Sequence, residues 1–341
     1  MSRSLRDRLL RAGALAAATT AVLAGCAIPV PEVEAEQAPE GPQPALDEPR
    51  IDRMLDAIGA AIEAGDEAGT VNEIRPRIDG PAMHTRKAEY RLAAATADSD
   101  NATTFQQLTT DPQVVVVSNE DEWPKRVFVF TTIADGMNTP LLLGLEQDDP
   151  REDYHLFAWV RLLPEVTTPA TAIPAEGSPE VAPDADGLVL SPQQAIEGYA
   201  DLLENGDDSD VADAFAEDIF RTYVTEDREA ISESVEDAGE YTETFQLRQF
   251  DPVALETSDG GAIVIGALRS DQTYERTIDD SEMTVGGEIA ALAGEDDGID
   301  VETSVTATYY MSVAFYIPPD ADDAQIQVLG AERVLDTVTT E

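Results

Sequence analysis

The sequence predicts an α+β protein of two tandem domains, each a helix cluster followed by a curved antiparallel sheet. Apolar residues recur at helical spacing at the start of each half and at strand spacing in its remainder. Two proline-rich stretches, residues 26–45 and 164–187, flank and separate the patterned regions. A length of 341 residues is sufficient for two domains of ordinary size. Helices that precede an antiparallel sheet pack on one of its faces, which is the α+β arrangement.

Residues 1–25 have the composition of an export signal. Four arginines in the first eleven positions precede an apolar run of small residues at positions 12–22. Crossing a hydrocarbon core takes about 20 apolar residues, so this run is too short to span a membrane. We expect the segment to be removed after export.

Leu23-Ala24-Gly25-Cys26 closes the apolar run and contains the only cysteine of the chain. It resembles the lipobox of bacterial lipoproteins. The resemblance implies cleavage between Gly25 and Cys26 and lipidation of the Cys26 thiol, with acyl chains such as palmitate. Residues 26–45 are then a disordered tether, and the protein is anchored by lipid at the extracytoplasmic face of the cell membrane. An ordinary signal peptide with an incidental cysteine is the alternative.

Three helices are expected at the start of the first domain, residues 46–163. The first ends near Gly65, a plausible capping residue, and the second is short, covers residues 71–76 and is interrupted by proline. The third begins near Gly80 and runs to about Thr96. The first helix has one apolar face, formed by Ile51, Met54, Leu55, Ile58 and Ile62.

Four strands should follow these helices in the first domain. Each is a β-branched or aromatic stretch bounded by turn-forming residues. They lie at residues 114–118, 126–133, 140–146 and 154–162. Residues 164–187 then form the predicted linker between the domains.

The second domain, residues 188–341, begins with a clear helix start. Ser191 and Gln194 have the spacing of a capping box, and Asn205-Gly206 should end this helix. The apolar pattern predicts a second helix from about Ser209 and a third over residues 227–238. Five strands are expected after them, at residues 241–248, 253–257, 262–268, 305–317 and 326–338.

Both halves thus place helices before antiparallel strands, and this element order is similar to that of cystatin-like and NTF2-like rolls. Residues 258–261, Ser-Asp-Gly-Gly, should form a hairpin turn within the second set of strands. The resemblance implies a bent sheet that wraps a long helix. We interpret the two halves as divergent copies of one unit.

Several short motifs are spread over most of the chain. They are Gly80-Pro81-Ala82-Met83 with Arg86 and Tyr90, Trp123-Pro124-Lys125-Arg126, Tyr154-His155-Leu156 with Trp159, Ser191-Pro192, Tyr199-Ala200-Asp201 and Ala214-Phe215. Together with the lipobox they make the chain similar to an uncharacterised lipoprotein family of high-GC Gram-positive, actinobacterial-type bacteria. That resemblance implies a location and an architecture, and no activity.

The composition is strongly acidic, with 69 acidic and 21 basic side chains and a net charge of −48. Such a surface repels polyanions, because phosphate contacts need clustered lysine and arginine. We therefore expect no nucleic-acid partner. With Cys26 consumed by lipid, the mature chain can form no disulfide, so its stability must come from packing.

No motif points to catalysis, a metal or a cofactor. His84 and His155 are the only histidines, and neither has a ligand-type partner at helical spacing, so each more often lies at the edge of a core. The acidic clusters do not match a calcium-binding loop, and the glycine pairs are not phosphate loops. We expect no catalytic residue, no metal site, no cofactor and no enzymatic activity.

Three aromatic residues, Trp123, Tyr154 and Trp159, form the only candidate pocket that the sequence offers. At strand spacing such residues more often belong to a core. The leading interpretation is a non-enzymatic binding or accessory module of the cell envelope, with an envelope protein or a small molecule as partner. A receptor for a solute or lipid with an apolar cavity, and an enzyme with a carboxylate base in an NTF2-like pocket, remain as alternatives.

Overall fold

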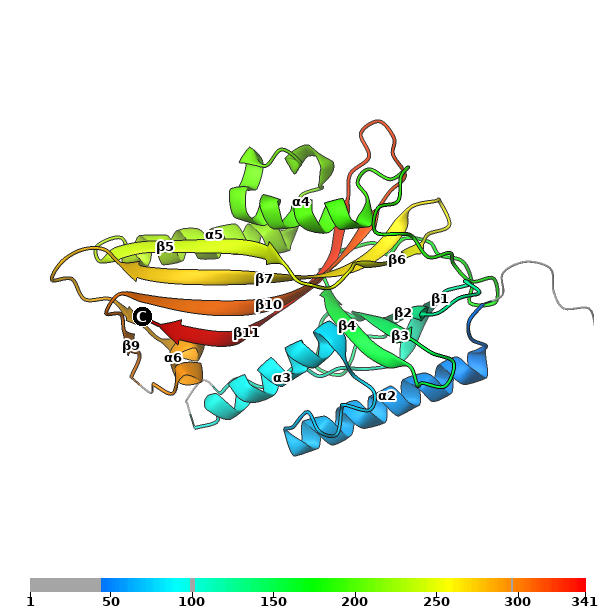
Figure 1. The fold of residues 1–341 in the computed structure, drawn as a ribbon, viewed down its shortest axis with the longest axis horizontal. Coiled ribbons are helices and arrows are strands. Elements are labelled where there is room, and N and C mark those ends of the chain that lie inside the picture. Colours follow the sequence, from blue (N-terminus) through cyan, green and yellow to red (C-terminus); the bar gives the residue numbers. More distant parts are fainter. Residues whose placement is uncertain (1–43, 99–101, 296) are drawn as a thin grey trace, which may run out of the picture. The chain divides into compact units, whose positions relative to one another are not determined.

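The computed structural model describes residues 44–98, 102–295 and 297–341, and they form a mixed fold with a large antiparallel sheet and five α-helices (Figure 1). The α+β class is therefore confirmed at this level. The sheet has nine strands in the order β1-β2-β3-β4-β11-β10-β7-β5, with β6 paired to β7. The predicted signal segment, Cys26 and almost all of the predicted tether lie outside the described residues. None of the helices in the described ranges is long and apolar enough to cross a membrane.

Helix α2 (Glu48–Ala68) buries the predicted apolar stripe and is capped by Asp47. The prediction that it ends near Gly65 was wrong, because it continues to Ala68 and ends at Gly69, whose φ is +62°. Gly65 serves packing instead. A Cβ placed on it would lie 2.3 Å from Cγ2 of Ile74, so only glycine permits this close approach.

The short helix predicted over residues 71–76 is a series of turns. Leu156 donates a backbone hydrogen bond to the Arg77 carbonyl at 2.8 Å, and Ile78 forms a parallel bridge with Leu156. The turns therefore end where residues 77 and 78 pair with the strand that contains Leu156. Helix α3 (Gly80–Ala95) follows and matches its prediction closely.

All four strands predicted for the first half are present. They are β1 (Pro112–Val117), β2 (Lys125–Thr131), β3 (Leu141–Gln147) and β4 (His155–Leu162). Each pairs antiparallel with the next, as short connections favour. Helix α3 packs against β4 and also reaches β10 and β11.

Helix α4 (Pro192–Asn205) has the predicted capping box, with the Ser191 side chain and the Gln194 side chain each bonded to the other's backbone N–H. It lies close to the sheet, since a Cβ on Gly266 would meet Ile196 at 2.2 Å. After α4 the chain makes two short 3-10 turns, Gly206–Asp208 and Ala212–Ala214.

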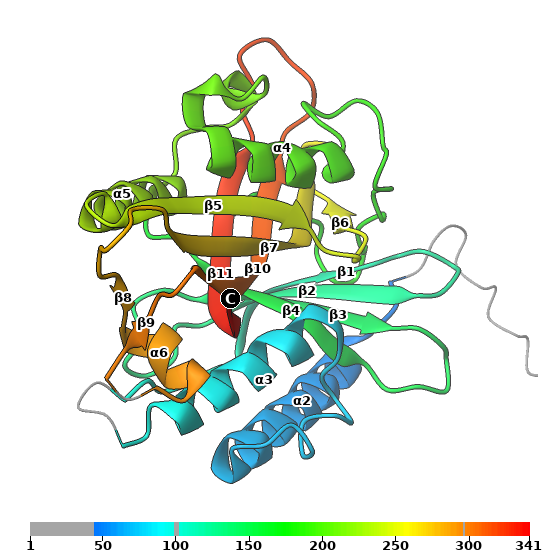
Figure 2. The same ribbon diagram turned by 60° about the vertical axis from the view of Figure 1, so that its left-hand side comes forward.

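The prediction of a helix that starts at about Ser209 was wrong. Phe215 forms a bridge with Ile326, which holds the chain extended at that point. Helix α5 (Ile219–Val235) begins after its N-cap, Asp218, and includes most of the residues of the helix predicted over 227–238. Helices α4 and α5 both pack on β5, and α4 also packs on β7 (Figure 2).

The strands of the second half are also present, and two short ones were missed. They are β5 (Gly239–Leu247), β6 (Val253–Glu256), β7 (Ala262–Arg276), β8 (Thr284–Val285), β9 (Ile299–Asp300), β10 (Ser304–Ile317) and β11 (Gln327–Thr340). The predicted hairpin turn joins β6 to β7. Helix α6 (Gly287–Ala293) was not predicted, because its seven residues are too few to show a helical period.

The two halves meet in one sheet. Strand β4 pairs with β11 through only two residue pairs, Leu162 with Gly330 and Arg161 with Ala331. The predicted linker also contacts both halves, since Ser178 donates to the Val117 carbonyl at 2.8 Å and Val181 to the Ala254 carbonyl at 3.0 Å. The division into two domains at residues 164–187 stays a prediction.

Candidate functional site

A cleft of about 340 Å³ opens beside β11 and is the best candidate for a functional site. We call it the β11 cleft. Its walls come from α3, α5, α6, β7, β10, β11 and the segment that follows α3. Its lining residues are Glu89, Leu92, Thr103, Thr104, Phe105, Gln106, Phe220, Tyr223, Asp227, Gln272, Glu288, Tyr309, Glu332, Arg333, Val334 and Leu335.

The pairing of β11 explains why the cleft forms here. Strand β4 pairs with β11 only as far as Ala331, so the following residues lie at an edge that β4 does not cover. Successive residues of a strand point to opposite faces. Glu332 and Arg333 therefore enter two different side-chain networks, and both still line the cleft.

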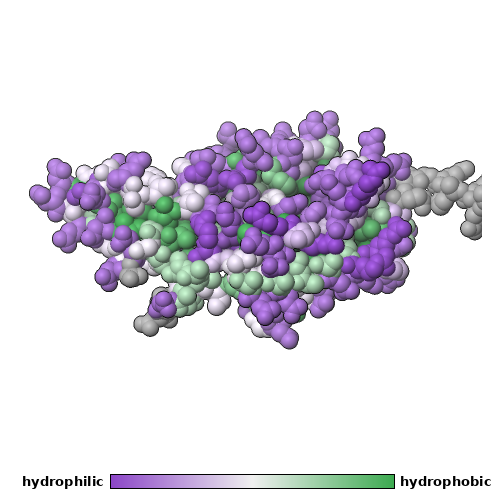
Figure 3. All heavy atoms as spheres, turned by 60° about the horizontal axis from the view of Figure 1, so that its bottom comes forward, coloured by the Kyte–Doolittle hydropathy of each residue, from purple (hydrophilic) through white to green (hydrophobic). Residues whose placement is uncertain are grey.

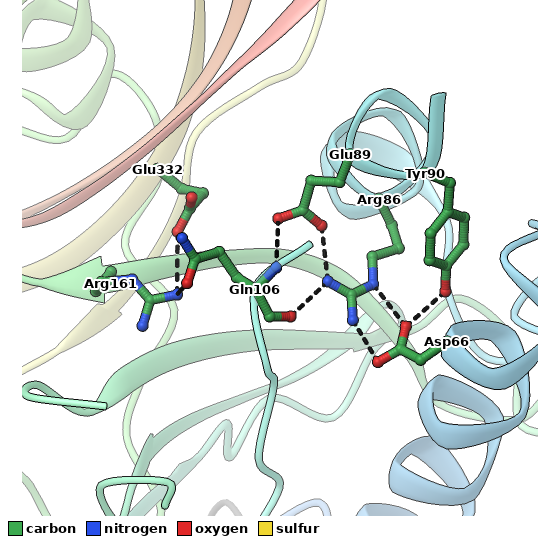
Figure 4. Close-up of polar contacts among 7 residues, drawn as sticks. All are labelled: Asp66, Arg86, Glu89, Tyr90, Gln106, Arg161 and Glu332. Carbon is green, nitrogen blue, oxygen red and sulfur yellow. Dashed lines mark hydrogen bonds and ion pairs between the residues drawn. The ribbon is translucent and has the colours of Figure 1, made fainter. Parts of the chain in front are cut away.

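The first network surrounds the fully buried guanidinium of Arg86 (Figure 4). Asp66 on α2 accepts two hydrogen bonds from it, at 3.0 and 2.5 Å, and Glu89 accepts one at 2.7 Å. The Gln106 carbonyl accepts a further bond at 2.7 Å. Tyr90 donates its hydroxyl to Asp66 at 2.7 Å. One buried cation thus joins α2, α3 and the segment after α3.

Glu332 lies at the cleft end of this network. Arg161 donates to the Gln106 side chain at 3.3 Å, and its Nη2 lies 3.8 Å from Oε2 of Glu332 (Figure 4). That oxygen is buried and has no hydrogen-bond partner among the described residues. Burial raises the pKa of Glu332 to about 7, although Arg161 opposes the shift. Burial also raises the pKa of Glu89, against the attraction of Arg86.

The second network lies on the other face of β11. Arg333 donates to the buried Glu243 at 2.6 Å, and its guanidinium lies 4.2 Å from the centre of the Tyr309 ring. Gln272 donates to Glu243 at 3.4 Å, and Arg228 lies 3.8 Å from it. The charge of Arg333 is therefore balanced inside the protein rather than offered to the cleft.

Helices α5 and α6 complete the wall with more acidic and aromatic groups. Asp227 and Tyr223 come from α5, and Glu288 comes from the first turn of α6, where Thr103 donates to it at 2.6 Å. Carboxylates and aromatic faces both attract organic cations. The arrangement can bind a positively charged group, and Glu332 can exchange a proton near neutral pH.

The three residues of the predicted pocket do not lie together. Tyr154 and Trp159 are buried in the core that α2 forms with β2, β3 and β4. Trp123 is 42% exposed, and its ring lies 4.9 Å from Nζ of Lys125. None of the three lines the β11 cleft.

The two histidines have different neighbours. Nδ1 of His155 lies 3.8 Å from Asp79, the residue before α3. His84 on α3 is exposed and stacks on Tyr310, with 5.4 Å between the ring centres. Neither residue lines the β11 cleft.

Sequence reasoning missed the residues of the β11 cleft. Arg86 was noted only as part of a family motif, and Glu332-Arg333 only as part of a predicted strand. The available signal was the charged pair Glu332-Arg333, which interrupts the apolar run from Val328 to Leu335 and is unusual for a buried strand. Nothing local indicates which residues this pair would meet.

The fold and the cleft define an antiparallel α+β protein with a polar, ligand-sized cleft at the edge of its longest strands. The family model described as "Domain of unknown function (DUF8094)" matches residues 54–337, so the chain belongs to that family. Searches of curated proteins and of solved structures found no match.

Replacing Arg86 by methionine should destabilise the protein by about 3–5 kcal/mol, because the buried Glu89 and the half-buried Asp66 would lose their cation. Urea unfolding followed by tryptophan fluorescence measures the change. Arg91→Met is the matched control on the same helix. Its side chain is 38% exposed, so its loss should cost about 1 kcal/mol or less. Equal losses in the two variants would contradict the role given to Arg86.

The raised pKa of Glu332 predicts a pH-dependent stability. The carboxyl of Glu332 binds a proton more tightly in the folded state than in the unfolded state, where its pKa is near 4.5. The free energy of unfolding therefore falls as pH rises from about 4.5 to about 7. The loss should reach about 3 kcal/mol above that window. Glu332→Gln should remove this part of the slope in urea titrations at pH 5 and pH 8.

Glu288→Gln is the control for this titration, because Glu288 lines the same cleft but is exposed. It should leave the slope of the wild-type protein unchanged. A slope that persists in Glu332→Gln would show that another group causes the pH dependence.

Proposed function

We propose that the protein is a lipid-anchored, non-enzymatic binding module on the extracytoplasmic face of the cell membrane. The lipobox at Leu23–Cys26, the preceding export signal and the proline-rich stretch of residues 26–45 support the anchor. The polar surface supports the proposal that the folded part of the chain lies in water next to the membrane. Hydrophilic residues cover most of the face in Figure 3.

The ligand that fits the β11 cleft best is a small organic cation. The observation that carries this proposal is the buried oxygen of Glu332, which lines the cleft without a hydrogen-bond partner among the described residues. A buried polar atom without a partner is costly, and a bound donor would remove that cost. An ammonium group has both the donors and the charge.

The charges around the cleft favour the same class of ligand. Asp227 and Glu288 add two further carboxylates to its wall, whereas Arg333 is paired with Glu243. The exposed ring of Tyr223 supplies a face on which an alkylammonium group can rest. The field of the whole protein adds to this preference, since its net charge is −48.

A tandem arrangement of two cystatin-like or NTF2-like rolls is the finer architecture that we propose. Its support is that each half contributes a helix that packs on antiparallel strands, α3 on β4 and α4 on β5. The shared order of helices before strands in the two halves supports it further.

A second candidate function is an enzyme that uses Glu332 as a general base. The favouring observation is its pKa of about 7, which suits proton transfer near neutral pH. A carboxylate of this kind in a cleft was one of the alternatives that the sequence left open.

Cys26→Ser should abolish the proposed anchoring. The wild-type protein should incorporate a labelled fatty acid and sediment with membranes, because several acyl chains hold a protein stably in a bilayer. The variant should incorporate no label and appear in the soluble fraction. Equal labelling or equal membrane retention in the two proteins would exclude lipidation at Cys26.

Isothermal titration calorimetry with ethylamine, ethanolamine and putrescine, which are protonated at neutral pH and carry N–H donors, tests the cleft. Asp227→Asn and Glu332→Gln should each weaken the binding of a recognised amine several-fold to about tenfold, through loss of one charge contact. Glu229→Gln on the exposed side of α5 is the matched control and should bind as the wild type does.

Two outcomes would count against the cation proposal. One is the absence of binding by every amine of the panel, and the other is an equal loss of affinity in the Glu229→Gln control. Chemical conversion of a bound amine, followed by NMR spectroscopy and lost in Glu332→Gln, would favour the enzymatic candidate instead.

A further inference from the structure

A second cleft, of about 390 Å³, lies beside the start of α3 and is distinct from the β11 cleft. We call it the α3 cleft. His84 lines it from α3, Arg248 and Phe250 from the segment that ends β5, Arg269 from β7 and Tyr310 from β10. The two clefts share no lining residue.

The charge of the α3 cleft is opposite to that of the protein. About one residue in five of the chain is acidic, yet none of the ten residues that line this cleft is Asp or Glu. Two of the ten are arginines. In a chain with 69 acidic and 21 basic side chains, such a lining concentrates positive charge at one place.

The charge of Arg248 is not balanced by a nearby carboxylate among the described residues. None of the ion pairs within the described ranges includes it. Its guanidinium lies 4.9 Å from the centre of the Tyr310 ring, and Tyr310 is only 4% exposed. Arg269, by contrast, donates to Asp271 at 2.8 Å. The buried ring thus fixes the position of a half-buried guanidinium that has no carboxylate partner.

The pKa of His84 is lowered by partial burial of its ring and by nearby positive charges. Partial burial is the largest cause, and the charges of Arg248 and Lys87 lower the pKa of His84 further. Asp336 is the one acidic group that opposes them. The positive charges therefore outweigh the negative one at this face of α3.

We propose that the α3 cleft binds a small organic oxyanion, a carboxylate or a phosphate ester, with Arg248 as its principal partner. The planar guanidinium suits the two oxygens of either group. Phe250 offers apolar contact to the organic part of the ligand. A soluble anion fits better than a lipid headgroup, because a body of net charge −48 is repelled by an anionic bilayer.

Isothermal titration calorimetry of the full chain with benzoate, and separately with phenyl phosphate, tests this proposal. The wild-type protein should bind at least one of them, and the better ligand identifies the group that the cleft prefers. Arg248→Gln should weaken binding roughly tenfold or more, because it removes a charged hydrogen-bond donor. The affinity of Arg248→Lys should lie between those of the wild type and Arg248→Gln, because lysine keeps the charge but lacks the planar guanidinium.

Arg151→Gln is the matched control, because it removes one positive charge from an exposed loop that does not line the cleft. It should bind as the wild type does, and circular dichroism should show that all variants are folded. The proposal fails if neither anion binds, or if Arg248→Gln binds as tightly as the wild type. Binding to vesicles of anionic phospholipid in place of the soluble anions would also overturn it.

Discussion

The buried guanidinium of Arg86 is the interaction on which the arrangement of the first half depends. An arginine with no exposed surface is stable only when its donors meet acceptors, and here three groups supply them: Asp66, Glu89 and the Gln106 carbonyl. These acceptors come from α2, α3 and the segment after α3. The requirement to satisfy one cation therefore fixes how these elements sit on the sheet, and through Gln106 it positions Arg161 next to Glu332.

The short contact between β4 and β11 is the second constraint. Two residue pairs are enough to continue the sheet, but they leave β11 uncovered by β4 after Ala331. A longer ladder would cover this edge of β11, where Glu332 and Arg333 line the cleft. The cleft is therefore a consequence of where the pairing stops, and the charged residues lie where both sides of the strand can be reached.

Much of the local structure could be predicted from the sequence, because its causes are local. The capping box at Ser191, the hairpin turn at residues 258–261 and the long strands depend on neighbouring residues, and all are confirmed. The errors have non-local causes. Gly65 looked like a helix end because its packing against Ile74 is invisible in the sequence, and the chain at Phe215 is extended because it meets Ile326, more than a hundred residues away.

The candidate sites could not be predicted for the same reason. Glu332 gains its raised pKa from burial beside groups of α3 and β4, and Arg248 gains its position from Tyr310. Each residue alone is one charge in a chain where charged residues make up 26%. Only the fold shows which charges are balanced internally and which face a cleft.

Helix α3 links the two clefts physically. Its residue His84 lines one and its residue Glu89 lines the other, and Arg86 lies between them in the sequence. The network around Arg86 therefore fixes the helix that contributes a residue to each cleft. Long-range attraction cannot explain an anion site on this protein, because the overall field has the wrong sign and is screened over about 10 Å in 0.1 M salt. An anion would have to be held by short-range contacts with Arg248 and its neighbours, whereas a cation in the β11 cleft would have the field of the whole protein in its favour.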